Sequence, residues 1–334
     1  MLTVTLDVLL IFLNTMSPNL KYLLSAIVLL LSMPLAAHNT FLDLQHWQLQ
    51  ADLSIQDGKV YERVFDGAHQ LSELEWDIQE IPIGILTASY AYSPSVTWHF
   101  ALWSRLLNEG KGQIIDRDWE NYSSTTPTHL SIHEAPITRA HGYTLSVDAI
   151  LSHIPDYDIG IETFPYSLHM KAAQLHGIVG YKTSLYRWVA HGGFLNYPIG
   201  TFSIPSNVSL LWYEQRLRAP FAGLAYSCAL NDGLLTLQAT ATTFATADDL
   251  DKHYARNLIF EGEFHLAEWY TLEANYLYPL TNNLKVHIGY ALDWMPTRRG
   301  NSLIRDIDFT EEVANSAGIA HKTHHYTLGL HQQF

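Results

Sequence analysis

Length, composition and charge limit the classes of protein that this chain can form. Its 334 residues include 33 acidic and 19 basic side chains, giving a net charge of −14, and 48% of them are hydrophobic. Aromatic residues, at 12%, are too frequent for a disordered chain, so we expect an ordered fold. The acidic balance argues against a nucleic acid partner, whose phosphates need clustered lysine and arginine, and favours a cationic partner. The single cysteine, Cys228, excludes an internal disulfide and a thiolate metal cluster.

The N-terminal segment is typical of an export signal. Lys21 precedes an apolar run, and the run ends at the small residues Ala36 and Ala37. This order of a basic region, an apolar core and small residues predicts a secretory signal peptide over residues 1–37, with Met16 as an alternative start. A transmembrane anchor is the other interpretation, but the small residues favour cleavage. We therefore expect one mature domain over residues 38–334.

Beyond residue 45, apolar and polar residues alternate with the period of a β-strand. In residues 47–56, apolar side chains at every second position alternate with glutamine, aspartate and serine. The same alternation recurs over residues 71–80, 143–150, 234–241 and 326–330. Turn-forming residues separate these runs at 92–95, 155–156, 231–233 and 281–283.

The connections between these strands have two different lengths. Besides the short turns, the chain has long polar stretches at residues 116–140, 190–207, 245–257 and 298–321. Short turns at one end and long loops at the other are typical of an outer-membrane barrel, and the sheet must close because unpaired amides cannot lie in hydrocarbon. We predict an all-β fold, a transmembrane antiparallel β-barrel of roughly 8 to 14 strands.

The C-terminus supports the barrel interpretation. The chain ends in Phe334, and Tyr326, Leu328 and Leu330 lie on one face of the last predicted strand. Aromatic-terminated strands of this kind are recognised by the barrel assembly machinery, which we expect as a partner. A secreted β-sandwich is the alternative fold.

Two acidic pairs are the candidate chemical groups. Asp116 and Asp118 end an apolar strand, and Asp249, Asp251 and His253 alternate in a second stretch. In a strand, residues two apart face the same side, so each set would share one face. If both faces point into the barrel mouth, four carboxylates and an imidazole can converge on one cleft.

Such a cluster suits hydrolysis by an activated water molecule. A carboxylate beside histidine raises the basicity of the imidazole and selects its tautomer. Two close carboxylates raise the pKa of one of them and can hold a water between them. The alternative is that these acidic residues form a solvated loop surface, because an Asp-x-Asp pattern alone is a weak motif. The 18 histidines show no metal-ligand spacing, so no metal site is predicted.

Several segments with these residues resemble a known family. They are GKVYERV (58–64), residues 103–119, YEQRLRAPFAGL (213–224), DLDKHY (249–254) and RRGNSLIRD (298–306). In this order, over essentially the whole mature chain, the sequence resembles the omptins, endopeptidases in the outer membrane of Gram-negative bacteria. The resemblance implies ten strands, five long extracellular loops and an active-site groove that faces the cell exterior.

The resemblance also implies roles for the acidic residues. Asp116 and Asp118 match the aspartate couple of the family, and Asp251 and His253 match its aspartate–histidine couple, which together bind and activate water. The expected activity is cleavage next to arginine or lysine in cationic peptides or host proteins.

Further matches concern substrate and lipid binding. Glu62 and Asp249 match the acidic residues that bind a basic side chain before the scissile bond, as charge-assisted hydrogen bonds would allow. Ser131 and His133 match a further element of the substrate groove, although the spacing after them differs.

The family depends on lipopolysaccharide bound to the outer face of the barrel. Arg216 and Tyr181 match that site, whereas Leu185 stands where a basic residue is expected and Thr183 replaces an acidic one. We expect no cofactor other than lipopolysaccharide as an activator.

Three other functions compete with proteolysis. A non-enzymatic surface adhesin or receptor could bind cationic ligands at the same acidic mouth. A lipid hydrolase would need a serine–histidine pair beside the lipid, and none is evident in the sequence. A passive porin is disfavoured because side chains fill a barrel this narrow.

Overall fold

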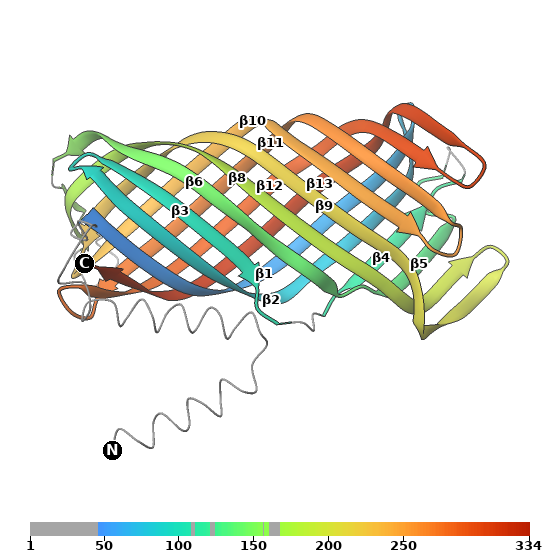
Figure 1. Ribbon diagram of the computed structural model, residues 1–334, viewed down its shortest axis with the longest axis horizontal. Helices are drawn as coiled ribbons and strands as arrows, with labels where there is room; N and C mark the ends of the chain where they lie inside the picture. The colour runs from blue at the N-terminus through green and yellow to red at the C-terminus, as the bar shows by residue number, and fades with distance from the viewer. Residues whose placement is uncertain (1–45, 108–110, 121–123, 156, 160–167) are drawn as a thin grey trace, which may run out of the picture.

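The computed structural model describes residues 46–107, 111–120, 124–155, 157–159 and 168–334. In this part of the chain, one antiparallel sheet of thirteen strands curls into a barrel (Figure 1). The strands are β1 (Trp47–Asp66), β2 (His69–Ser93), β3 (Val96–Arg105), β4 (Gln113–Asp118), β5 (His129–Glu134), β6 (Ile137–Ile154), β7 (Tyr157–Ile159), β8 (Leu168–Tyr197), β9 (Gly200–Leu230), β10 (Gly233–His253), β11 (Leu258–Pro279), β12 (Leu284–Arg305) and β13 (Thr310–Gln333). No helix among the described residues is long and apolar enough to cross a membrane.

The sheet closes into a ring of ten strand positions. Strand β1 pairs with both β2 and β13, so the first and last long strands close the barrel. Strands β3 and β4 both pair with β2 and together fill one position, and β5 and β6, which both pair with β8, fill the next. The predicted antiparallel barrel of ten strands is therefore confirmed.

The two ends of the barrel differ, as the sequence predicted. The start of β1 and the end of β13 lie at one end of the barrel (Figure 1). The short turns between β2 and β3, β9 and β10, and β11 and β12 lie at the same end. At the other end, residues 190–207, 245–257 and 298–321 are strand for most of their length rather than loops. Paired strands can continue into water because polar side chains on both faces leave the backbone ladder intact. The predicted signal peptide and most of the 155–168 connection lie outside the described residues.

A band of exposed apolar side chains encircles the part of the barrel near the termini. It includes Leu53, Ile55, Trp98, Phe100, Leu102, Leu145, Val179, Leu224, Leu237, Phe244, Leu272, Ile288, Tyr326 and Leu328. A membrane-crossing strand needs roughly 9–11 residues, whereas β1 has 20 and β9 has 31. The far half of the barrel therefore extends beyond the hydrocarbon, and we call its open end the mouth.

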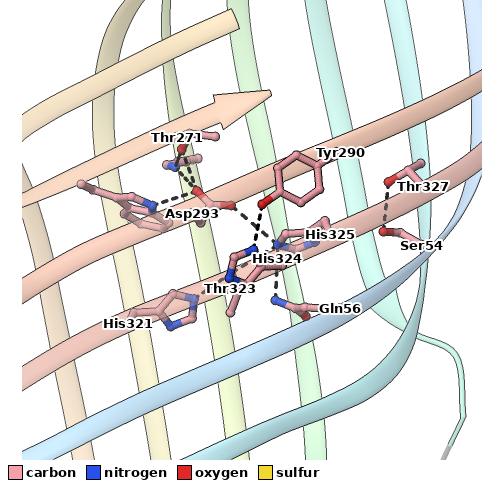
Figure 2. A network of polar contacts seen from close by, with 12 residues as sticks. Ser54, Gln56, Thr271, Tyr290, Asp293, His321, Thr323, His324, His325 and Thr327 are labelled. Carbon is pink, nitrogen blue, oxygen red and sulfur yellow. Dashed lines mark hydrogen bonds and ion pairs between the residues drawn. The ribbon is translucent and has the colours of Figure 1, made fainter. Parts of the chain in front are cut away.

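The barrel interior within the apolar band is polar and internally paired. The Lys182 ammonium donates to Asp293 Oδ1 at 2.8 Å and to Thr271 Oγ1 at 2.5 Å, and it lies 3.7 Å from the Trp269 ring centre. The Trp269 indole N–H also donates to Asp293 Oδ1, at 2.9 Å. Figure 2 shows this carboxylate beside His325 on the inner face of β12 and β13. Pairing of this kind offsets the desolvation of both charges.

Above this interior, an aromatic layer spans the barrel. Trp76 of β2 stacks on Tyr213 of β9 with ring centres 4.9 Å apart and an interplanar angle of 11°. Trp188 of β8 contacts both rings, at 5.9 and 5.7 Å, and Tyr186 stacks on Trp188 at 5.8 Å. All four side chains are buried. This layer, together with the buried aliphatic residues around it, forms a floor beneath the mouth.

The interior ion pair yields a stability prediction. Lys182→Met leaves the Asp293 carboxylate buried without its cation, so we expect a loss of roughly 3–5 kcal/mol of unfolding free energy. Lys182→Met combined with Asp293→Asn removes both charges and should cost clearly less. Urea unfolding of the refolded barrel, followed by its mobility on gels, measures both. Equal losses in the two variants would show that the pair is not the source of the effect.

Candidate functional site

The acidic residues of β1 and β4 stand directly above the aromatic floor. Glu62 lies two residues beyond the buried Val60, and Asp116 lies two residues beyond the buried Ile114, so each faces the barrel interior one step closer to the mouth. The Ser72 and Ser131 hydroxyls approach the two oxygens of Asp116 at 3.4 Å each. Strand alternation alone thus turns these carboxylates inward.

Asp118 ends β4 where the chain leaves the barrel wall. It pairs with Ser72 of β2 and His129 of β5, and its carbonyl accepts a hydrogen bond of 2.7 Å from the Thr128 N–H. This backbone contact fixes the strand end. Among its charged neighbours, Asp118 contributes most to raising the pKa of Asp116. The two carboxylates therefore face the same space.

The second acidic set lies on β10. Asp249, Asp251 and His253 all point inward, and His253 Nε2 lies 2.5 Å from Asp251 Oδ2. Asp251 is 1% exposed, and its other oxygen, Oδ1, has no hydrogen-bond partner among the described residues. The second ring nitrogen, Nδ1, accepts a hydrogen bond from the Arg256 guanidinium in the turn after β10. The imidazole is therefore held between an anion and a cation.

The electrostatics show that the two sets converge across the mouth. Burial, followed by Asp118 and Asp251, raises the pKa of Asp116 to about 7, and Arg256 opposes the shift. Burial, followed by Asp251, Asp249 and Asp116, raises the pKa of Glu62 well above its usual range. Because charges must lie close to shift each other's pKa, carboxylates from β1, β4 and β10 share one cleft. All of them lie beyond the apolar band.

A cavity of about 240 Å³ opens beside this cluster. Glu62, Asp66 and Asp249 supply its acidic groups, and Arg63 also lines it. Its apolar walls are formed by Val64, Phe65, Leu71, Phe260, Ile304, Val313 and Ala317. Asp249 is held by the Gly262 N–H at 2.9 Å and the Tyr213 hydroxyl at 3.2 Å. Burial raises the pKa of Asp249 to about 7 against these two donors. An acidic end and apolar walls fit the long stem and charged head of lysine or arginine.

Ser131 and His133 have different positions. Ser131 belongs to the cluster through its contact with Asp116 Oδ2. The His133 ring is buried lower in the wall, where Nδ1 donates to the carbonyl of Gly192, and burial lowers its pKa. The structure thus brings Ser131, but not His133, into contact with an acidic residue of the site.

Arg216 and Tyr181 lie on the outer face, on the neighbouring strands β9 and β8. Both Arg216 and Arg187 form ion pairs with the buried Glu214, each with an N–O distance of 2.5 Å. Arg187 also lies 4.8 Å from the Trp212 ring centre. Leu185, which stands where a basic residue was expected, pairs with Arg216 in the sheet, and Arg187 follows it two residues later on the same face.

Sequence reasoning missed four residues of the site. Ser72 contacts Asp116, Arg256 contacts His253, and Tyr213 and Gly262 hold Asp249. A Cβ atom at position 262 would lie 2.3 Å from Asp249 Oδ1, so glycine is needed there. The position of Arg256 close behind the Asp-x-His pattern was a usable signal, whereas the others depend on strand register.

Comparisons with known proteins concern the family and the fold of the chain. The sequence profile of the Omptin family matches residues 45–334. The chain is 27% identical to the plasminogen activator of Yersinia pestis over 85% of this chain and 88% of that protein. It is 25% identical to Protease 7 of Escherichia coli K12 over 86% and 90%. The solved structure of the E. coli outer membrane protease OmpT is similar with a TM-score of 0.78 at 23% identity, over 89% of this chain and 99% of that one.

The crowded carboxylates predict a pH dependence of stability. A carboxyl group whose pKa is about 7 when folded and 3.8 when unfolded binds a proton more tightly in the folded state. The protonated carboxyl group of Asp116 therefore contributes to the unfolding free energy at low pH. This contribution is lost as pH rises from about 4 to 7. At pH 8, Asp116→Asn should raise the unfolding free energy by about 1–3 kcal/mol, and at pH 4 it should not.

Thermal unfolding in detergent at the two pH values tests this prediction. Asp308→Asn, at an exposed position between β12 and β13, is the matched control and should change neither value. A destabilising effect of Asp116→Asn at pH 8 would contradict the prediction.

Proposed function

The chain belongs to the omptin family, and we propose that it is an endopeptidase that cleaves cationic peptides or proteins next to arginine or lysine. It is a protease of the Gram-negative outer membrane, and its barrel fold is that of an outer-membrane protein. The observation that carries the specific activity is the convergence of Asp116, Asp118 and the Asp251–His253 pair over an apolar floor. The mouth, opposite the short turns, would face the cell exterior.

The proposed reaction uses a water molecule between the two couples. With Nε2–H donated to Asp251, the free lone pair of His253 lies on Nδ1, where it can take a proton from water. Asp116 and Asp118 accept the second water hydrogen and so orient the oxygen toward the scissile carbonyl. The protonated His253 then returns its proton to the leaving amine. No covalent intermediate is needed.

Arg256 sets a condition on this mechanism. Its guanidinium donates to the same Nδ1 atom that must accept the proton. The contact therefore has to open before turnover, and Arg256 lies at an exposed turn where it can move. Competition from a cationic substrate for the surrounding carboxylates would favour its displacement.

Substrate selection is proposed to rest on the cavity of Glu62 and Asp249. A basic side chain before the scissile bond would place its stem against the apolar walls and its head between the carboxylates. Ser131 would line the groove beside the reacting bond. His133, which is committed to Gly192, would shape the groove without contacting substrate.

Lipopolysaccharide is proposed as an activator on the outer face. Arg216 uses only part of its five N–H donors on Glu214, so its exposed guanidinium can also bind a lipid phosphate. Tyr181 lies nearer the apolar band, where it can contact acyl chains. Arg187, two residues from Leu185, would supply the basic group that the lipopolysaccharide site lacks at position 185. The barrel assembly machinery is proposed to recognise β13, whose Tyr326 and Leu328 are exposed on the outer face.

Cleavage of an Arg-Arg peptide by the refolded, lipopolysaccharide-loaded protein tests the proposal. Asp116→Ala or His253→Ala should lower kcat roughly 10²–10⁴-fold because each removes a group that holds or deprotonates water. Mass spectrometry of the products gives the cleavage site, and gel mobility shows that the barrel has folded.

An interior pair provides the matched control for these variants. Asp148 and His176 also form an Asp–His contact, at 2.9 Å, but they lie inside the barrel on β6 and β8 near the end with the short turns. Asp148→Asn should leave cleavage unchanged. Peptide binding without cleavage by the wild-type protein would instead indicate an adhesin or receptor, and full activity of His253→Ala would remove the mechanism.

The lipid proposal has a separate test. Arg216→Ala should raise the lipopolysaccharide concentration needed for half-maximal activity about tenfold, because one charge-assisted contact is lost. Arg305→Ala, which removes an exposed arginine paired with Glu261 near the mouth, is the control and should not change it. Activity that is independent of lipopolysaccharide in the wild type would contradict this proposal.

A further inference from the structure

A chain of hydrogen bonds leads from Asp249 into the barrel interior. The Tyr213 hydroxyl lies 3.2 Å from Asp249 Oδ2, and the Gln215 amide nitrogen lies 3.5 Å from the Tyr213 oxygen. Gln215 Oε1 lies 3.2 Å from His321 Nδ1. All four side chains are buried, so water does not compete for these contacts.

The chain continues along the inner face of β13. Thr323 Oγ1 lies 3.3 Å from both His321 Nε2 and His325 Nε2, and His325 Nε2 lies 3.7 Å from Asp293 Oδ2. Figure 2 shows these side chains in a row beside the paired carboxylate of Asp293. The specificity cavity at the mouth and the ion pair in the interior are thereby linked.

The donor and acceptor capacities give this chain one direction. Tyr213 has a single hydroxyl hydrogen, and it points to Asp249 because an ionised carboxylate can only accept. The Tyr213 oxygen then accepts from the Gln215 amide, whose carbonyl must in turn accept from His321 Nδ1–H. His321 Nε2 is left to accept from Thr323. Every hydrogen is directed toward Asp249, and such chains strengthen each member bond.

Asp249 and Glu62 therefore differ although both line the same cavity. Asp249 receives donors from Gly262 and Tyr213, whereas Glu62 Oε2 is buried with no hydrogen-bond partner in the described structure. Donors aimed at a carboxylate stabilise its charged form. Of the two carboxylates, Asp249 is thus the one whose anionic form the fold supports better.

We propose that Tyr213, oriented by Gln215 and His321, is a positioning residue that fixes the Asp249 carboxylate toward the cavity and stabilises its negative charge for binding of a guanidinium or ammonium head. The role of the cavity in binding basic side chains rests on the proposed function. Around Asp249, groups that can titrate or carry charge are Glu62 from β1, Tyr213 from β9, and Asp248 and Asp251 from β10. Arg63 and Asp66 of β1 line the same cavity, and β11 contributes the Gly262 N–H.

Tyr213→Phe removes the terminal donor and keeps the ring that stacks on Trp76. We expect KM for an arginine peptide to rise roughly tenfold, as for loss of one hydrogen bond to a charged group, with kcat within about twofold. The acid limb of kcat/KM should move to higher pH, because a carboxylate that loses a donor binds its proton more tightly.

Tyr186→Phe is the matched control. Tyr186 belongs to the same aromatic floor, but its hydroxyl accepts from Gln56 at 2.6 Å and does not reach Asp249. It should leave KM and the pH profile unchanged. His321→Leu, which interrupts the chain two steps away, should shift both in the same direction as Tyr213→Phe but by less.

Benzamidine binding, measured by calorimetry from pH 5 to pH 8, separates this inference from the protease proposal. Wild-type affinity should fall as pH decreases, and Tyr213→Phe should weaken it and move the fall to higher pH. If the wild type shows this pattern but cleaves no peptide, the protease proposal fails and the positioning role stands.

Three results would overturn the positioning role. The first is identical behaviour of Tyr213→Phe and Tyr186→Phe in KM, pH profile and benzamidine affinity. The second is a decrease in kcat as large as the rise in KM for every peptide, together with reduced thermal stability. That result would show that Tyr213 has only a structural role. The third is the absence of benzamidine binding by the folded wild type.

Discussion

The rest of the structure depends on the requirement that every backbone N–H and C=O within hydrocarbon be paired. Each unpaired backbone amide there costs about 2 kcal/mol or more. The strands therefore close into a ring through the β1–β13 and β1–β2 pairings. Closure sets each strand's register relative to its neighbours. Because side chains alternate between the two faces, it also determines that Glu62, Asp116 and Asp251 point inward at the mouth.

Buried carboxylates in the interior are paired with donors, whereas those at the mouth are only partly paired. In the interior, Asp293 accepts from Lys182, Thr271 and Trp269, so its charge is compensated inside the fold. At the mouth, Glu62 and Asp251 each keep a buried oxygen with no partner among the described residues. A fully paired carboxylate stabilises a structure, whereas an unpaired one is a cost that an incoming donor or water can relieve. This contrast separates structural acid groups from those available to a ligand.

The aromatic floor makes the difference possible. Trp76, Trp188 and Tyr213 fill the cross-section below the mouth and desolvate the carboxylates above them. The same layer carries the Tyr213 hydroxyl, so one side chain contributes both the low-polarity environment and a donor to Asp249. Site electrostatics and packing are therefore not independent at Tyr213, and changes to this side chain should alter both.

The sequence by itself determined the strand alternation, the outward apolar face of the last strand and the shared face of Asp249, Asp251 and His253. These properties follow from period two along one strand, which neighbours in the chain define. It did not reveal that most polar connections are continuing strand, because their residues no longer alternate once both faces meet water. Only the tertiary structure decided that Glu62 and Asp116 face the β10 carboxylates, that Arg256 lies on His253, and that Tyr213 and Gly262 hold Asp249. Those contacts join strands far apart in the chain, and they depend on register and ring closure, which local periodicity does not encode.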